Sequence, residues 1–437
     1  RFVGAVETVW SGRTEVYKQI EMEVVPGERL GCFQLGMGVN DALVLLKKYF
    51  VPKRPKVDVV YSSKMPLEQD IVLKVEELGL HLRFEPVSQR LRMIDVFDLT
   101  KLSISYSGST VGSKTSPRPS FLQLYKIFGP TYPGEYDEAL DMYLLRYRGI
   151  CFMFSLPDDL KAVYAKTNEL PLELRDGTSP LAGRMMVYNG FDERHATLVD
   201  AVVDEPVKLN GIQLTTLASS YLEQVCFKIS ETGTTLQFLR RHRNLRIGSS
   251  VQDVLSELGQ PSRIYFKHDN RMKIHAAGED PSAKPAPTWF HSSPEFLSSI
   301  PLVSRISQKD PSSCFQPSDY FYNYFELGLD LLLDAATHTI KKVIAHSNFP
   351  GHSEFSLYNK CEFRVVFSAP DDKGEPVIIS PEMKWADVEA LLGPCGRPMI
   401  HDSGIVANPF GATHLYAYNG CVFEVMRSGY VAKVTVF

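Results

Sequence analysis

Hydrophobic positions recur at helical spacing in four short stretches of the chain. Three of them end at a glycine with a proline directly behind it or one residue further on: Phe121 to Phe128, Val251 to Leu258 and Trp385 to Leu392. A glycine beyond the last helical turn easily adopts a left-handed conformation, and the proline then prevents the helix from continuing. A fourth helix is predicted over Asp41 to Phe50, with Asn40 as its cap.

A strand signal follows each predicted helix. Four runs begin with a glycine and then alternate between apolar and other positions: Gly79 to Phe84, Gly149 to Phe154, Gly328 to Leu333 and Gly420 to Val425. A period of two is typical of a half-buried strand. Neither a short helix nor a β-meander buries its apolar face alone, so the helix is expected to lie across the sheet. The sequence therefore predicts an α+β fold, β-rich overall, made of repeated two-layer units of one short helix on an antiparallel β-meander.

The repeat also predicts the division of the chain. The distance from helix end to glycine-led strand is similar in all four units once the Pro- and Ser-rich stretch 276–316 is set aside as a disordered insertion. We expect a flexible N-terminal segment over 1–20, a first α+β unit over 21–118, and a second over 119–245 with extra β-structure. A third unit covers 246–370 and contains the insertion, and a fourth covers 371–437.

Composition narrows the classes of function. The 437 residues contain 47 Lys and Arg against 51 Asp and Glu, a formal net charge of −4, which argues against a nucleic-acid partner. No apolar run approaches the roughly 18 residues of a membrane-spanning helix. The seven cysteines are widely spaced and include no Cys-x-x-Cys pair, so neither a disulfide framework nor a zinc cluster is expected. The first ten residues lack a signal pattern, and we expect a reducing, cytoplasmic setting.

Catalytic motifs are absent from the sequence. It contains no P-loop, no His-Glu-x-x-His and no Gly-x-Ser-x-Gly pattern, so we predict no catalytic residue, no cofactor and no metal site. His338, His346 and His352 lie close together in the sequence and are the residues on which an enzyme or metal site would have to be built. A turn whose histidines make ordinary hydrogen bonds is the preferred interpretation.

The densest cationic run consists of Arg240, Arg241, Arg243 and Arg246. Arginines in such a run contact anionic lipid headgroups or an acidic partner, and the alternative is an ordinary solvated face.

An aromatic cluster suggests a partner surface. In a strand, Tyr320, Tyr322 and Tyr324 point to one side, while Phe321 and Phe325 point to the other. We expect the phenylalanine side to face the core and the tyrosine side, with the nearby loop from His346 to His352, to bind a partner. Burial of both faces between layers is the alternative.

Several segments together resemble a known family. They are Leu80 to Arg92, Phe128-Gly-Pro-Thr-Tyr-Pro-Gly-Glu-Tyr136, Met272 to His275, Asp319 to Asp334, His346-Ser-Asn-Phe-Pro-Gly-His352, Lys360-Cys-Glu-Phe363 and Asn408-Pro-Phe-Gly411. In these segments the chain resembles the phagosome assembly factor family, formerly an uncharacterised family with a distant Lin-10 label.

The resemblance implies a non-enzymatic autophagy adaptor. It implies a complex with a β-propeller protein of the breast-carcinoma-amplified-sequence-3 type and peripheral association with phosphoinositide-containing phagophore membranes, mainly through that partner. The expected location is the cytoplasm, with recruitment to the phagophore assembly site, the preautophagosomal membrane. The alternatives are a lipid-binding module and an enzyme with an unrecognised site.

Overall fold

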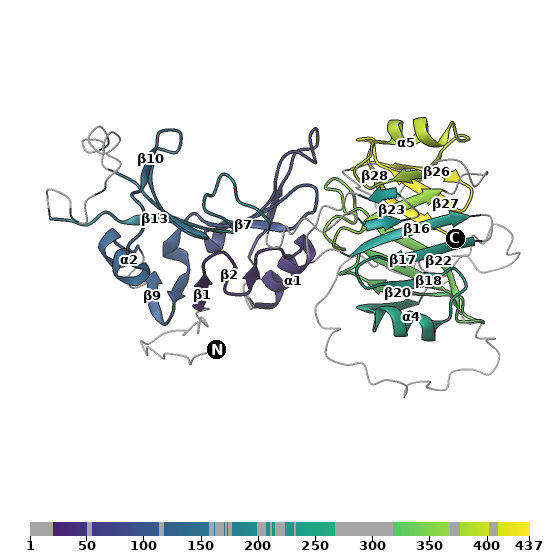
Figure 1. Ribbon diagram of the computed structural model, residues 1–437, viewed down its shortest axis with the longest axis horizontal. Coiled ribbons are helices and arrows are strands. Elements are labelled where there is room, and N and C mark those ends of the chain that lie inside the picture. Colours follow the sequence, from purple (N-terminus) through teal and green to yellow (C-terminus); the bar gives the residue numbers. More distant parts are fainter. Residues whose placement is uncertain are drawn as a thin grey trace, which may run out of the picture.

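Two β-rich lobes lie side by side along the long axis of the molecule (Figure 1). The computed structural model describes residues 21–49, 55–112, 118–156, 161, 170, 173, 177–198, 207–209, 212–214, 223–230, 233–266, 318–367, 376–401 and 410–437. The described residues between 21 and 198 form the first lobe, and those between 223 and 437 form the second. The predicted N-terminal segment 1–20 and the predicted insertion 276–316 lie outside the described residues.

The first lobe contains two sheets. Its eight-stranded sheet has the order β10-β11-β12-β13-β7-β6-β5-β4, and its five-stranded sheet has the order β3-β2-β1-β8-β9. The strands of the larger sheet are β4 Asp58–Val60, β5 Ile71–Val75, β6 Leu80–Phe84, β7 Leu91–Val96, β10 Glu135–Asp137, β11 Met142–Tyr147, β12 Ile150–Phe154 and β13 Ala182–Tyr188. Those of the smaller sheet are β1 Glu21–Val25, β2 Arg29–Leu30, β3 Phe33–Gln34, β8 Ser103–Tyr106 and β9 Ser109–Gly112.

The second lobe repeats this arrangement. Its sheets have the orders β25-β26-β27-β28-β22-β21-β20-β19 and β18-β17-β16-β23-β24. The larger sheet contains β19 Arg263–Phe266, β20 Tyr320–Tyr324, β21 Leu329–Leu333, β22 Ile340–His346, β25 Met399–His401, β26 Thr413–Tyr418, β27 Cys421–Val425 and β28 Val431–Val436. The smaller sheet contains β16 Gln224–Ser230, β17 Gly233–Phe238, β18 Arg243–Arg246, β23 Glu362–Phe367 and β24 Val377–Ile379. A separate hairpin, β14 Val207–Leu209 and β15 Ile212–Leu214, lies between the lobes in sequence.

The internal repeat extends to the details of strand pairing. Every strand of the first lobe has a counterpart fifteen strands later, and β1–β8 and β16–β23 are the parallel pairs among otherwise antiparallel described strands. A register shift before Phe84 in β6 recurs before Leu333 in β21. Two meanders join edge to edge in each lobe, through β7–β13 and β22–β28. The predicted fold class, β-rich α+β with antiparallel meanders, is therefore confirmed, and the boundaries proposed for the four units remain a prediction.

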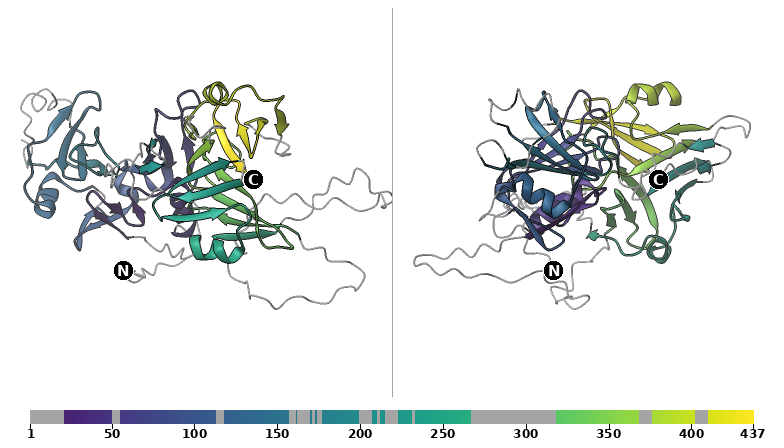
Figure 2. Two further views of the ribbon diagram at one scale, coloured as in Figure 1. Left: turned by 45° about the vertical axis from the view of Figure 1, so that its right-hand side comes forward. Right: turned by 60° about the vertical axis from the view of Figure 1, so that its left-hand side comes forward.

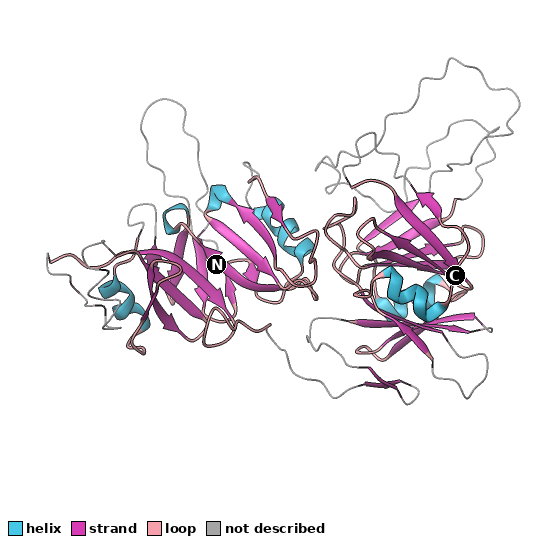
Figure 3. Ribbon diagram, turned by 90° about the horizontal axis from the view of Figure 1, so that it is seen from above, coloured by secondary structure: helices cyan, strands magenta, loops and turns pink. Residues whose placement is uncertain are grey.

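Four α-helices are found among the described residues: α1 Val39–Tyr49, α2 Phe121–Phe128, α4 Val251–Leu258 and α5 Trp385–Leu392. In the second lobe of Figure 1, α5 lies at the top and α4 at the bottom. Seen from above, strands dominate both lobes, and the short helices lie against them (Figure 3). Helix α4 begins with a capping box, in which Ser250 and Asp253 satisfy each other's backbone N–H groups. No described helix has the length and apolar character needed to span a bilayer.

The helix ends were predictable, whereas one helix start was not. Gly129, Gly259 and Gly393 follow the last turns with φ of 82°, 81° and 83°. The first helix begins at Val39, so Asn40 lies inside it and is not its cap. The Asn40 side chain instead donates hydrogen bonds to the second lobe, as described below.

Each lobe has its own hydrophobic core. The first core includes Phe84, Phe152 and Phe154, and the second includes Phe227, Phe363 and Phe423. The C-terminus lies beside the teal strands of the smaller sheet in both views of Figure 2, and Thr234 Oγ1 donates to Phe437 O at 3.3 Å. The C-terminal residue therefore contacts the smaller sheet of the second lobe.

Candidate functional site

A long connection from the second lobe reaches the first. Residues 347–361, which we call the arm, connect β22 to β23, whereas residues 97–102 connect the equivalent strands β7 and β8 of the first lobe. Phe355 of the arm packs against the first core, and Phe349 lies in a small cluster with Leu67 of the first lobe. The arm is thus the main described contact between the lobes.

The contacts of the arm with the first lobe are mostly polar. Gln89 Nε2 donates to Asn348 O at 2.9 Å, and Asn348 Nδ2 donates to Gln89 Oε1 at 2.7 Å. Asn40 Nδ2 donates to the carbonyls of Ser356 and Leu357 at 2.8 and 3.0 Å. A polar interface of this kind fixes register by hydrogen bonding more than by buried apolar area.

One close approach at the junction requires a glycine. Asn359 Nδ2 donates to Asp41 Oδ2 at 3.1 Å, immediately beside Gly38. A Cβ added to Gly38 would lie 2.1 Å from Asn359 Oδ1, far closer than any real contact. Gly38 therefore lets the start of α1 meet the arm.

Lys360 is a buried cation at the same junction. Its side chain is 1% exposed, and its Nζ lies 2.6 Å from Val87 O of the first lobe. Two carboxylates of the second lobe balance it, Glu362 at 2.8 Å and Glu382 at 2.5 Å. Burial alone would lower the pKa of Lys360, but these two charges raise it above its ordinary value. Lys360 therefore remains charged and ties the lobes together.

His346 lies in a second buried polar cluster. Its Nε2 is 2.9 Å from Asp330 Oδ2, and its ring stacks on Tyr358 at 3.8 Å. The Tyr358 hydroxyl donates to Asp330 at 2.8 Å, and Asn323 Nδ2 donates to Asp330 at 2.5 Å. Burial, and then the Asp330 charge, raise the pKa of Tyr358. The cluster therefore fixes His346 within its own lobe.

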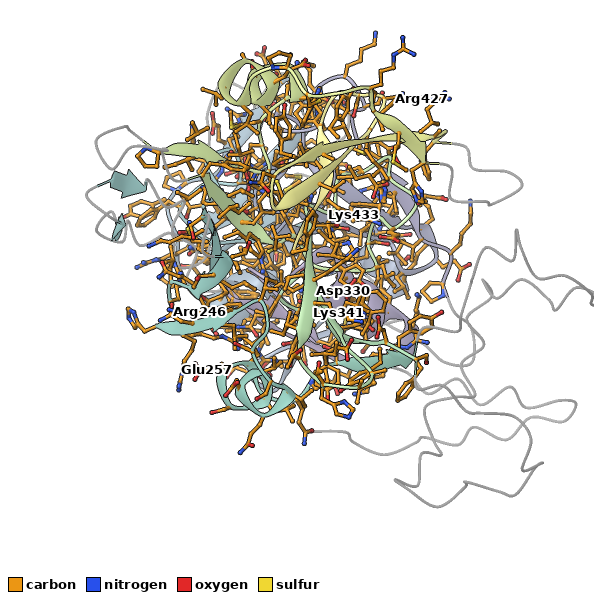
Figure 4. All side chains as sticks on the ribbon, turned by 90° about the vertical axis from the view of Figure 1, so that its right-hand side faces the viewer. Arg246, Glu257, Asp330, Lys341, Arg427 and Lys433 are labelled. Carbon is orange, nitrogen blue, oxygen red and sulfur yellow. The ribbon has the colours of Figure 1, made fainter. Side chains whose placement is uncertain are left out.

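His352 joins a neighbouring group of charges. Its Nε2 is 3.3 Å from Glu424 Oε1, which also accepts from Thr413 Oγ1 at 2.7 Å. Lys433 Nζ lies 2.7 Å from Glu354 and 3.5 Å from Glu424. Burial would raise the pKa of Glu424, but the bond to His352 and the Lys433 charge lower it to about 2. Figure 4 shows Lys433 and Asp330 in the body of the second lobe and Arg427 at its edge.

A cavity of about 230 Å³ opens onto this group, and we call it the His352 cavity. The first lobe contributes Tyr61, Ser63 and Pro66 to its wall. His352 Nδ1 accepts the backbone N–H of Glu354 at 3.2 Å, so that nitrogen is already engaged. Within the described part of the chain, no group of three or more His, Cys, Asp or Glu side chains could hold a metal ion. The third histidine of the sequence prediction, His338, lies apart and bonds the Tyr320 hydroxyl at 2.8 Å.

The residues of the expected partner surface are buried. Tyr320, Tyr322 and Tyr324 are 9%, 8% and 4% exposed and belong to the second core, whereas Phe321 and Phe325 are only half-buried. The prediction that the tyrosine side faces outward is wrong, because the three rings pack into the second core and the hydroxyls of Tyr320 and Tyr324 are hydrogen-bonded there. Tyr324 OH, for example, donates to Gly259 O at the end of α4, at 2.9 Å.

The histidines of the same expected surface are also enclosed. His346 and His352 are 5% and 7% exposed, because the arm and the strands of their own lobe cover them. The expectation that these five residues are exposed is therefore wrong, and their role in binding a partner stays a prediction.

The arginine run divides into two parts. The backbone N–H groups of Arg240 and Arg241 donate to Glu223 Oε1, at 2.9 and 3.5 Å. Arg243 and Arg246 are exposed on the edge strand β18, and Arg243 lies 3.6 Å from Glu257 of α4. Figure 4 labels Arg246 and Glu257 on this part of the second lobe. A role of the four arginines in contacting anionic lipid or an acidic partner stays a prediction.

The sequence did not predict which residues of the two lobes meet at the junction. Gln89 and Lys360 lie in two of the segments that carried the family resemblance, but no periodicity links residues hundreds of positions apart. A lysine two residues before a strand, as Lys360 is before β23, was the one local signal available.

Comparison with known proteins gives consistent matches over nearly the whole chain. The model of the family described as phagosome assembly factor 1 matches residues 29–296 and 303–437. The PHAF1 protein of Arabidopsis thaliana is 34% identical over 424 residues, covering 94% of this chain and 92% of the relative. The PHAF1 protein of Drosophila melanogaster is 32% identical over 445 residues, covering 96% and 94%. That of Caenorhabditis elegans is 24% identical over 424 residues, covering 93% and 90%.

No solved structure matches the chain. The family model and the two relatives above 30% identity agree with the resemblance read from the sequence segments. This chain belongs to the phagosome assembly factor 1 family.

Proposed function

We propose that this protein is a non-enzymatic adaptor in the assembly of phagosomes and autophagosomes. It binds a β-propeller protein of the breast-carcinoma-amplified-sequence-3 type and associates peripherally with phosphoinositide-containing phagophore membranes, mainly through that partner. It resides in the cytoplasm and is recruited to the phagophore assembly site. Family membership supports the assembly role.

The observation that carries the adaptor role is the junction between the lobes. Hydrogen bonds cross this junction: Lys360 Nζ donates to Val87 O at 2.6 Å, Gln89 Nε2 donates to Asn348 O at 2.9 Å, and Asn348 Nδ2 donates to Gln89 Oε1 at 2.7 Å. Groups so engaged hold two lobes in one orientation, which an adaptor needs in order to present fixed surfaces to its partners.

The membrane contact is supported by the exposed part of the arginine run. Arg241, Arg243 and Arg246 are exposed near the edge of the smaller sheet of the second lobe. Each exposed arginine near an anionic surface contributes about 1 kcal/mol, and salt screens this attraction. The chain then adds a weak, salt-sensitive contact to the contact made by the partner.

The alternative of an enzyme is favoured by one feature, the His352 cavity with its ionised Glu424 and half-buried Lys433. A lipid-binding module is less well supported, because the lining of the cavity includes Glu354, Glu424, Arg427 and Lys433, and acyl chains prefer apolar walls.

Re-expression of variants in cells that lack the protein distinguishes an adaptor from an enzyme. Cells lacking the protein receive the wild type, Glu424→Gln or a triple Arg241→Ser/Arg243→Ser/Arg246→Ser variant, and recruitment to phagophores is scored. The adaptor proposal expects folded Glu424→Gln to restore recruitment and the triple variant to restore it only partly. Loss of function in folded Glu424→Gln, with partner binding intact, would favour the enzyme.

A further inference from the structure

A second hollow lies between the lobes, separate from the His352 cavity. It has a volume of about 620 Å³, and we call it the Arg90 hollow. The first lobe contributes Arg90, the residues before α1 and Asp41, and the second lobe contributes Glu223, Arg240, Arg241, Glu326 and Lys360.

Most charged groups around the hollow already have partners. Asp41 accepts from Gly38 N and from Asn359 Nδ2, at 3.2 and 3.1 Å. Glu223 accepts from the backbone of Arg240 and Arg241. Lys360 is balanced by Glu362 and Glu382.

Arg90 is the buried exception, whereas Glu326 is exposed to solvent. The residue is 7% exposed, yet within the described part of the chain its guanidinium makes no hydrogen bond and no ion pair within 4.0 Å. Burial lowers its pKa, and the more distant charges of Asp41 and Glu362 act in the opposite direction. None of its nitrogens is among the fully buried atoms that lack a partner, so the guanidinium reaches the hollow that it lines. A largely desolvated cation without a hydrogen-bond acceptor is costly, and its N–H donors are therefore available to an incoming acceptor.

The surroundings select the kind of acceptor. Residues Gly36 and Met37, which lead into the N-terminus of α1, line the hollow, and a helix start favours negative charge. Asp41 and Glu362 already act on Arg90, so a doubly charged phosphate would be repelled by two carboxylates. A carboxylate carries a single charge, and its two oxygens match a guanidinium fork.

We propose that the Arg90 hollow is a binding site for a carboxylate group, held bidentately by Arg90. The group comes from a small free carboxylate or from an acidic residue of a bound peptide, and the two sources share this chemistry. Binding would place a ligand between the two lobes, beside Arg240 and Arg241. This site does not depend on the proposed adaptor function.

The test uses the full-length chain at constant ionic strength, with sodium chloride as the reference salt. Isothermal titration calorimetry with sodium acetate, and with acetyl-Gly-Glu-Gly-amide against its Gln analogue, measures affinity. Acetate binding alone assigns a small carboxylate, and binding of the Glu peptide but not its Gln analogue assigns an acidic segment. If neither acetate nor the Glu peptide binds, the proposal is overturned. It is also overturned if sodium chloride gives the same binding heat as sodium acetate.

Variants of Arg90 test whether the carboxylate binds in the Arg90 hollow. Arg90→Gln should weaken binding at least about tenfold, and Arg90→Lys should weaken it less, because the charge remains without the fork. Arg92→Gln is the matched control, since Arg92 is paired with Asp70 at 2.5 Å, and it should bind like the wild type. Unchanged affinity in Arg90→Gln contradicts the site.

A variant on the exposed rim keeps the test decisive if Arg90→Gln does not fold. Glu326 is exposed and lines the hollow, so Glu326→Gln removes a repelling charge without disturbing the core. Carboxylate affinity should rise by about two- to fivefold. Unchanged or weaker binding in this variant contradicts the proposal.

Discussion

Gln89 and Asn348 exchange side-chain hydrogen bonds across the two lobes, although they lie 259 positions apart in the chain. Both residues adopt a left-handed backbone, with φ of 55° and 51°. Asn348 Oδ1 also accepts the N–H of Ser356, at 2.8 Å, and so holds the arm closed on itself. A left-handed backbone outside glycine is costly, so the junction maintains this geometry through its bonds.

Removing either amide should destabilise the protein. Gln89→Ala and Asn348→Ala each leave a buried polar group without its partner, at about 1–3 kcal/mol in the free energy of unfolding. Asn348→Ala should cost more, because it also loses the bond to Ser356. Chemical denaturation checks this, with Asn244→Ala as control, since Asn244 is exposed on β18. The double variant should cost less than the sum of the single ones, and strict additivity would contradict a direct pairing.

Gly38→Ala should loosen the junction, because a Cβ at this position would meet Asn359 Oδ1. We expect lower thermal stability and faster proteolysis within the arm, with partial recovery in Gly38→Ala/Asn359→Ala. Gly183→Ala is the control, since a Cβ there has no neighbour within 4 Å. Equal stability of the Gly38 and Gly183 variants would show that the close approach is not maintained in solution.

Acid should destabilise the charged cluster of His352, Glu424 and Lys433. The pKa of Glu424 is about 2 in the folded chain against an ordinary value of 4.5. Its ionisation therefore stabilises the fold above pH 4.5, and this contribution, about 3 kcal/mol, is lost as the pH falls toward 2. Glu424→Gln should flatten the acid limb of stability against pH. Part of that limb should remain, because Asp95 also has a pKa of about 2 through His81 and Arg184. An unchanged acid limb would contradict the assignment.

The aromatic strand β20 gives a test of side-chain orientation. Tyr322→Ala and Tyr324→Ala should each lower stability by about 3–5 kcal/mol, since both rings lie in the second core. Phe321→Ala should cost less, because Phe321 is only half-buried. Tyr324→Phe isolates the hydroxyl bond to Gly259 and should cost about 1 kcal/mol. Thermal unfolding measures the stability of all four variants. A larger loss of stability in Phe321→Ala than in the two tyrosine-to-alanine variants would indicate that the tyrosines face outward.

Features set by neighbouring residues could be predicted from the sequence, whereas features set by contacts between distant residues could not. Gly129, Gly259 and Gly393 mark helix ends through their own backbone preference, so the sequence alone located them. Alternation in β20 showed that tyrosines and phenylalanines point to opposite sides, but it carried no information about which side the helix α4 covers. The hydroxyl of Tyr324 reads as a surface group until Gly259 O is placed beside it.

The junction was harder still to anticipate. Lys360 and Val87 meet only after both lobes have folded, and neither the charge of Lys360 nor its spacing indicates burial. The orphaned guanidinium of Arg90 likewise becomes noticeable only when its neighbours are known to be engaged elsewhere.

The most direct test of the central proposal is the affinity of the purified full-length chain for the purified β-propeller partner, measured by isothermal titration calorimetry with both proteins folded. The adaptor account predicts saturable binding at micromolar or lower concentration, retained in Glu424→Gln. Absence of binding between the two folded proteins would contradict it.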